Sequence, residues 1–68
     1  MNSKAFIRRV RRYAKHHKLV FHYDARKGKG SHGRVFLGDR LTTVKHGSIS
    51  PGLVHKMLKD LGIKSKEF

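Results

Sequence analysis

The stretch HGRVFLGDRLTTVK, residues 32–45, decides the predicted fold of this 68-residue chain. Apolar and polar side chains alternate on both sides of Gly38-Asp39, a dipeptide that suits the two-residue turn of a β-hairpin. We therefore predict one strand from about Ser31 to Leu37. A second strand is predicted from Arg40 to Lys45, where β-branched residues favour an extended backbone.

The position of the turn also determines which side chains share a face of the hairpin. Successive side chains of a strand point to opposite faces, so a turn at 38–39 places Val35, Leu37 and Val44 on one side. This apolar side is expected to pack against helices. The open side is then expected to carry three cross-strand pairs: Phe36 with Leu41, Arg34 with Thr43, and His32 with Lys45.

The segments on either side of the hairpin predict an α-β-β-β-α order. Upstream, Ser3 is the expected cap of a helix, and alternation over 19–24 predicts the first strand. Downstream, Ser50-Pro51 is a helix-start signal, and Gly62 is expected to end that helix in a left-handed conformation. We expect an α+β fold of two layers, in which two helices cover one face of a three-stranded antiparallel sheet.

Length and composition narrow the range of functions. The chain is long enough for one domain over 1–68, with 63–68 expected as a loose tail. Seventeen Lys and Arg against four Asp and Glu give a net charge of +13, which favours a polyanion or an acidic protein as partner, and nucleic acid first. There is no cysteine, which excludes a thiolate metal site. No apolar run is long enough for a signal peptide or a membrane span, so a cytoplasmic location is expected.

A second stretch, GKGSHG at 28–33, supplies the candidate chemistry. Because the hairpin is expected to place His32 on the open face, its imidazole could take a proton from a ribose 2′-hydroxyl at neutral pH. No carboxylate pair lies near it in the pattern, and the mechanism needs neither a metal nor another cofactor. From the residues alone, catalysis and plain RNA binding both remain open.

The residues around His32 are suited to a phosphate. Cations and backbone N–H groups stabilise the negative charge that develops on phosphorus, and a missing Cβ lets the backbone come close to it. The expected groups are the cations Lys29, Arg34 and Lys45, the hydroxyl of Ser31, and the amides around Gly30 and Gly33.

Three segments resemble the HicA family, small messenger-RNA-cleaving toxins of bacterial toxin–antitoxin pairs. They are MNSKAFIRRVRR at 1–12, GKGSHGRVF at 28–36, and LTTVKHG with SPGLVHKMLKDLGI over 41–63. They occur in the family's order and cover nearly the whole chain. The resemblance implies a fold similar to that of double-stranded-RNA-binding domains, and it gives His32 the role of the family's catalytic histidine.

The resemblance also implies partners. Messenger RNA would be the substrate, and an acidic HicB-like antitoxin would hold the toxin inactive. The expected RNA contacts are Lys27, Lys29, Gly30, Ser31, Arg34 and Lys45. Because the chain has no lid of its own, the antitoxin is expected to cover His32 and to use the exposed apolar pair Phe36 and Leu41.

This chain departs from the family's pattern at three positions. Lys45 stands where the family often has proline, Leu53 where it often has threonine, and Gly33 where it commonly has histidine or another polar residue. None of these removes His32. They leave the proton donor to the leaving 5′-oxygen unassigned, with His46 and Lys29 as candidates.

The sequence therefore predicts the toxin of a type II toxin–antitoxin system, a metal-independent endoribonuclease acting on messenger RNA through His32. The alternative is a non-catalytic module that binds double-stranded RNA or another nucleic acid. An adaptor for acidic proteins would also account for the charge, but it gives the Gly-Ser-His segment no role.

Overall fold

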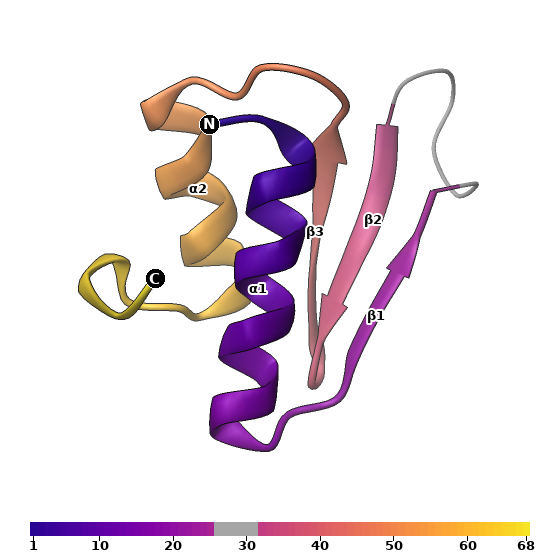
Figure 1. Cartoon of the computed structure of the whole chain (residues 1–68), viewed down its shortest axis with the longest axis vertical. Helices are drawn as coiled ribbons and strands as arrows, with labels where there is room; N and C mark the ends of the chain where they lie inside the picture. Colours follow the sequence, from indigo (N-terminus) through magenta and orange to yellow (C-terminus); the bar gives the residue numbers. More distant parts are fainter. Residues whose placement is uncertain (26–31) are drawn as a thin grey trace.

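A computed structural model describes residues 1–25 and 32–68 and has the α-β-β-β-α order (Figure 1). The sheet is antiparallel with β2 in the middle, and both helices lie on one of its faces. The predicted α+β class is confirmed. The elements are α1 (Ser3–His17), β1 (Phe21–Asp24), β2 (His32–Leu37), β3 (Arg40–Lys45), α2 (Pro51–Leu61) and the 3₁₀ turn η1 (Ser65–Glu67).

The predicted hairpin register is confirmed. His32 lies opposite Lys45, and the pairs Arg34–Thr43 and Phe36–Leu41 follow along β2 and β3. Because one face of the hairpin is apolar, a slip by one residue would have exposed it, which makes this register strongly preferred. The three pairs therefore share the face that is turned away from the helices.

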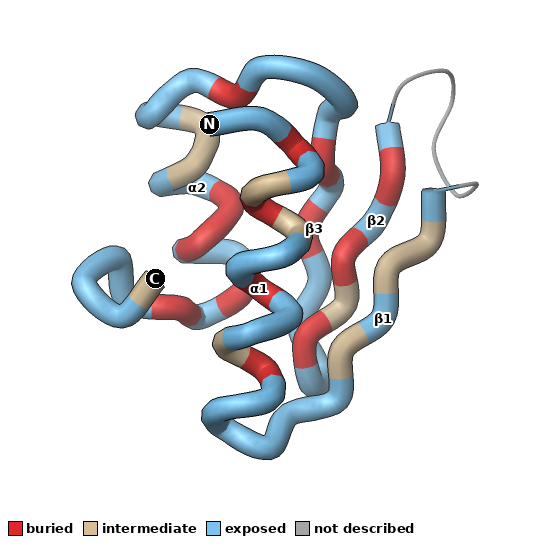
Figure 2. Tube along the Cα trace, viewed as in Figure 1, coloured by how far each residue is buried: buried red, intermediate tan, exposed pale blue. Residues whose placement is uncertain are grey.

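The core lies between that sheet and the two helices (Figure 2). Helix α1 contributes a stripe at helical spacing, helix α2 contributes a second one, and the sheet contributes alternate residues of β2 and β3. The open face of the sheet thus has no layer over it among the described residues. The principal core side chains are Phe6, Val10, Ala14, Val35, Leu37, Val44, Met57, Leu58 and Leu61.

Helix α1 is capped one residue earlier than expected. Asn2, not Ser3, is the N-cap, and its Oδ1 accepts a hydrogen bond of 2.8 Å from the amide of Ala5. The buried hydroxyl of Ser3 instead accepts from the amide of Gly47, and the Ser3 amide donates to the Gly47 carbonyl. These two bonds tie the start of α1 to the segment after β3, which a local capping pattern cannot reveal.

Strand β1 begins at Phe21, two residues later than expected. Helix α1 ends at Lys18, whose φ of 54° is left-handed, and the amide of Leu19 then donates to the carbonyl of Ala14. Leu19 therefore closes the helix end instead of opening the strand. The predicted end of α2 is correct, since Ser50 caps its start and Gly62, with φ of 73°, ends it.

The tail packs against the helices, although residues 63–68 were expected to be loose. Ile63 is only 5% exposed, and the ring of Phe68 lies 5.3 Å from the ring of Phe6. Arg9 Nη2 donates to the Phe68 carbonyl at 2.6 Å, and its guanidinium lies over the Phe68 ring. Ile63, Phe68 and Arg9 thus hold the tail in place, although its polar composition had suggested a loose segment.

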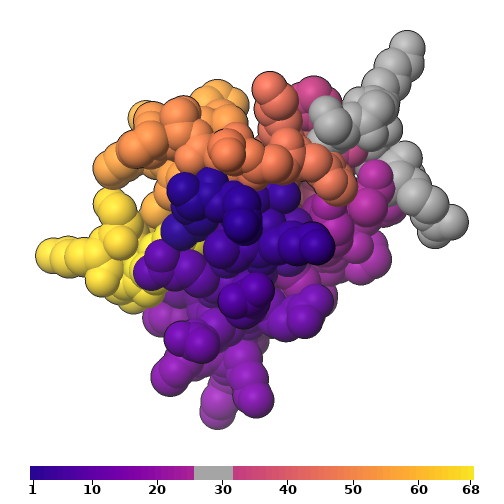
Figure 3. All heavy atoms as spheres, turned by 45° about the horizontal axis from the view of Figure 1, so that its top comes forward, coloured from indigo at the N-terminus to yellow at the C-terminus, as the bar shows by residue number. Residues whose placement is uncertain are grey.

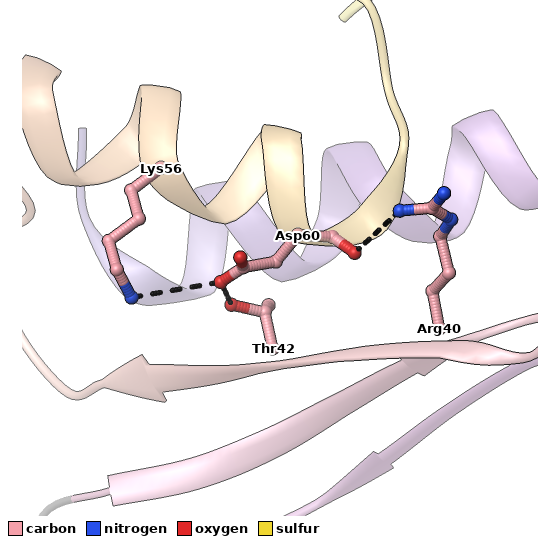
Figure 4. A network of polar contacts seen from close by, with 4 residues as sticks. All are labelled: Arg40, Thr42, Lys56 and Asp60. Atoms are coloured by element: carbon pink, nitrogen blue, oxygen red, sulfur yellow. Dashed lines mark hydrogen bonds and ion pairs between the residues drawn. The ribbon is translucent and has the colours of Figure 1, made fainter.

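A polar contact fastens α2 to strand β3 (Figure 4). Thr42, 3% exposed, donates to Oδ2 of Asp60 at 3.0 Å, and Lys56 Nζ lies 3.8 Å from the same oxygen. Arg40 Nη1 donates to the Asp60 carbonyl at 3.3 Å. A buried hydroxyl needs such a partner, and this one anchors α2 on the covered side of the sheet.

Candidate active site

The candidate site lies on the open face of the sheet. Strand β2 pairs with β1 on one side and with β3 on the other. The side chains of the open face therefore form rows that run across the sheet, from one strand to the next. One row is rich in apolar groups and the next two are polar. In order, the rows are His22–Phe36–Leu41, Asp24–Arg34–Thr43 and His32–Lys45.

His32 lies at the end of this face that is nearest the start of β2. It is exposed, it faces Lys45 across the β2–β3 ladder, and Arg34 follows it on the same face. Arg34 and Lys45 are exposed as well. The structure therefore brings one imidazole and two cations together where a polyanion can reach them, as the sequence predicted.

Four of the expected RNA contacts fall at 26–31, outside the described residues. They are Lys27, Lys29, Gly30 and Ser31. Their roles stay predictions.

The expected reason for a glycine at position 33 is wrong. This residue is buried, and a Cβ there would point toward the helices, so its absence does not bring a phosphate closer on the open face. A Cβ added there would lie 2.8 Å from Oη and 2.9 Å from Cε1 of Tyr23, both far inside van der Waals contact. The glycine makes room for a tyrosine ring from the neighbouring strand, not for a phosphate.

That tyrosine separates His46 from His32. Tyr23 Oη and His46 Nε2 form a hydrogen bond of 3.2 Å. The ring of Tyr23 crosses Gly33 on the helix side of the sheet, whereas His32 lies on the open side. The contact that the structure shows for His46 is thus with Tyr23, and its role as proton donor stays a prediction.

An apolar area borders the cationic end of the open face. Leu41 is 47% exposed, and Phe36 beside it is half-buried with its ring 5.7 Å from that of His22. Val20, 77% exposed, precedes β1 and accepts a hydrogen bond from the amide of Gly38. The pair expected to contact an antitoxin therefore lies on the same face as His32, two rows away.

Comparison with known proteins identifies no relative: no family model, no curated protein and no solved structure matches the chain. Over 1–25 and 32–68, no helix is both long and apolar enough to cross a membrane. In the same part of the chain, no three His, Asp or Glu side chains gather in a way that could hold a metal ion.

Proposed function

We propose that this protein is a metal-independent endoribonuclease that cleaves messenger RNA and is held inactive by an antitoxin. The observation that supports this most is the position of His32, exposed at the start of β2 beside Lys45 and on one face with Arg34. The net charge of +13 favours a polyanionic substrate. The resemblance to the HicA family is consistent with a catalytic role for His32 and with RNA as the substrate.

The reaction that suits these groups is transfer of the phosphoryl group within the RNA chain. His32 takes the proton of a ribose 2′-hydroxyl, and the 2′-oxygen forms a bond to the adjacent phosphorus. The bond from phosphorus to the 5′-oxygen breaks, and that oxygen takes a proton from water, which reaches the open face freely. The products are a 2′,3′-cyclic phosphate and a 5′-hydroxyl.

The two cations contribute to the same step. As the 2′-oxygen attacks, negative charge grows on the two non-bridging oxygens of the phosphate. Arg34 and Lys45 flank His32 and stabilise that charge, since oriented cations are worth more to the transition state than to the substrate. A guanidinium can donate two parallel hydrogen bonds to one phosphate, and an ammonium acts as a point charge.

Cleavage in the presence of a chelator tests this proposal. Purified protein, free of any partner, is expected to cut a defined transcript in EDTA and to leave cyclic phosphate ends, which mass spectrometry identifies. The same transcript with 2′-deoxyribose at the cleaved positions is expected to stay intact, because it lacks the attacking oxygen. Loss of cleavage in EDTA, or cleavage of the deoxy substrate, would contradict the mechanism.

A non-catalytic nucleic-acid-binding module is the second candidate. It is favoured by the row of exposed cations on α1, because this row lies on the helix layer, away from the face that carries His32. In the assay above, a protein of this kind would bind the transcript and leave it uncut in every buffer.

The partner that fits the open face is an acidic protein of the HicB kind. Occlusion of His32 needs a surface that spans the cationic end and the apolar pair Phe36 and Leu41. Acidic side chains would pair with the excess positive charge and speed association, while a buried apolar contact would hold the complex together.

Replacing Phe36 with aspartate is expected to weaken that complex at least thirtyfold, about the effect of losing one interface hot spot. His55→Asp makes a similar charge change on α2, away from the open face, and is expected to change affinity less than threefold. Calorimetry with the acidic product of the adjacent reading frame measures both. Equal losses, or an adjacent frame that encodes no acidic protein, would contradict the antitoxin assignment.

A further inference from the structure

Helix α1 carries a row of cations that the site on the sheet does not use. Lys4, Arg8, Arg11 and Lys15 are exposed and recur at spacings of three and four, so they lie on one side of the helix. The helix contains no acidic residue. Pairs of like charge one turn apart destabilise a helix, so this row is unfavourable for α1 unless something anionic binds it.

Three of these cations, all but Lys15, form one wall of a groove between α1 and the sheet. Lys4, Ile7, Arg8 and Arg11 line one stretch of it together with Tyr23 of β1. The guanidinium of Arg11 lies 5.4 Å from the ring centre of Phe21, the other half-buried aromatic of β1.

The groove widens toward the start of α1. There Lys4, Ile7 and Tyr23 line a cavity of about 400 Å³ together with Asn2, Ser3, His46 and Gly47. This volume lies within the range of about 300–1,000 Å³ that is usual for small-ligand sites. Figure 3 brings this end of the molecule forward, with the first turns of α1 between the segment after β3 and strand β1. We call this surface the α1 groove and define it by Lys4, Ile7, Arg8, Arg11, Tyr23 and His46.

Tyr23 gives the α1 groove a wall suited to a nucleobase. Its ring is held over Gly33 and oriented by the hydrogen bond between its hydroxyl and Nε2 of His46. A ring that is already held in place loses little freedom when a base stacks on it. Stacking on an aromatic ring beside cations that bind phosphates is the usual way in which proteins bind single-stranded nucleic acid.

We propose that the α1 groove binds a short single-stranded segment of RNA, with Lys4, Arg8 and Arg11 on phosphates and a base on Tyr23. The inference rests on the proposed function for the choice of RNA as the polyanion. It adds a substrate-binding surface on the helix layer to the open face that carries His32. Strand β1 is an edge strand, so one RNA chain can pass around it from the groove to the open face.

The other anionic surfaces fit the groove less well. A membrane would require the apolar face of α1, but Phe6, Val10 and Ala14 on that face are buried in the core. An acidic protein would pair with the cations, but it has no nucleobase to stack on the ring of Tyr23. A double helix presents paired bases that cannot stack on Tyr23.

Binding of fluorescein-labelled 2′-O-methyl decauridylate, measured by anisotropy over a range of salt concentrations, tests the inference. This probe cannot be cleaved through its 2′-oxygen, so the result does not depend on catalysis. The double variant K4Q/R8Q is expected to weaken binding about tenfold near 0.1 M salt and to lower the salt slope by about 1.4. The matched variant K59Q/K64Q removes the same charge beside α2 and is expected to change the affinity less than threefold.

Tyr23 variants test the stacking contact. Tyr23→Leu is expected to weaken binding about tenfold, and Tyr23→Phe, which keeps the ring but loses the hydrogen bond that orients it, only about two- to threefold. Removing the i,i+4 repulsion between Lys4 and Arg8 does not weaken the helix, so K4Q/R8Q reports on binding even if Tyr23→Leu unfolds the protein.

Three results would overturn the inference. They are equal losses in K4Q/R8Q and K59Q/K64Q, displacement of the probe by polyglutamate as readily as by polyuridylate, and tighter binding of a 2′-O-methyl duplex than of the single strand. If the probe binds and the groove variants weaken it as expected, but the protein cuts no RNA, only the proposed function would be contradicted. Normal cleavage with unchanged binding in K4Q/R8Q would contradict only the groove.

Discussion

His32→Ala is expected to slow RNA cleavage by about 10²–10⁴-fold, the usual contribution of one general acid–base group. In the proposed reaction, this imidazole takes the proton of the attacking 2′-hydroxyl, and alanine cannot do so. Single-turnover cleavage with protein in excess, in EDTA, measures the chemical step apart from binding. Affinity for an uncleavable 2′-O-methyl transcript is expected to change little, because Arg34 and Lys45 remain.

The matched control for this variant is His22→Ala. His22 is exposed on the same face and is truncated in the same way, but it lies two rows from His32. It is expected to cleave within about twofold of the unaltered protein, and circular dichroism should show both variants folded. Normal cleavage by His32→Ala, or the same loss in His22→Ala, would mean that His32 does not transfer the proton.

The position of His32 was predictable because local chemistry determines the hairpin. A two-residue turn with a glycine at its first position, flanked by strict alternation, leaves one register that buries Val35, Leu37 and Val44. The start and end of α2 followed from similarly local signals, a capping serine before proline and a left-handed glycine. Local sequence patterns were therefore sufficient to predict which side chains lie on the open face and how they form three cross-strand pairs.

Several features that local rules missed depend on contacts between distant segments. Ser3 is bound to Gly47, and Phe68 packs on Phe6, so neither the contact that ties the start of α1 to the segment after β3 nor the ordered tail could be read from neighbouring residues. The register of β1 was hidden as well, because residues 25–31 separate the two strands, and the rule that ties a two-residue turn to a register does not apply to a connection of that length. The pairing of Tyr23 with His46 over Gly33 therefore could not be foreseen.

The second large effect is expected at Gly33, where alanine should lower the free energy of unfolding by about 1–3 kcal/mol, the usual cost of overpacking. The new Cβ would lie 2.8 Å from Oη and 2.9 Å from Cε1 of Tyr23. Gly33 belongs to the central strand and cannot shift without disturbing both neighbours, so the tyrosine ring must move. For 68 residues, total stability is about 3–10 kcal/mol, so the loss is a large fraction of it.

Thermal unfolding measures this loss, and each kcal/mol is expected to lower Tm by about 4–8 °C in a domain of this size. Gly52→Ala is the matched control. An added Cβ meets no atom within 4 Å there, and alanine in a helix is favoured over glycine by about 0.5–1 kcal/mol, so its effect should have the opposite sign.

A double-mutant cycle identifies the cause of the loss at Gly33. If contact with the tyrosine ring is responsible, Gly33→Ala should cost much less in a Tyr23→Ala background than in the unaltered protein, with a coupling of about 1 kcal/mol or more. Equal costs in the two backgrounds would place the strain in the strand itself. A neutral or stabilising Gly33→Ala would mean that the Tyr23 ring does not rest over Gly33. The Tyr23 ring would then no longer be held as a wall for a stacked base, and the proposed α1 groove would lose the feature that favours a single-stranded nucleic acid over other polyanions.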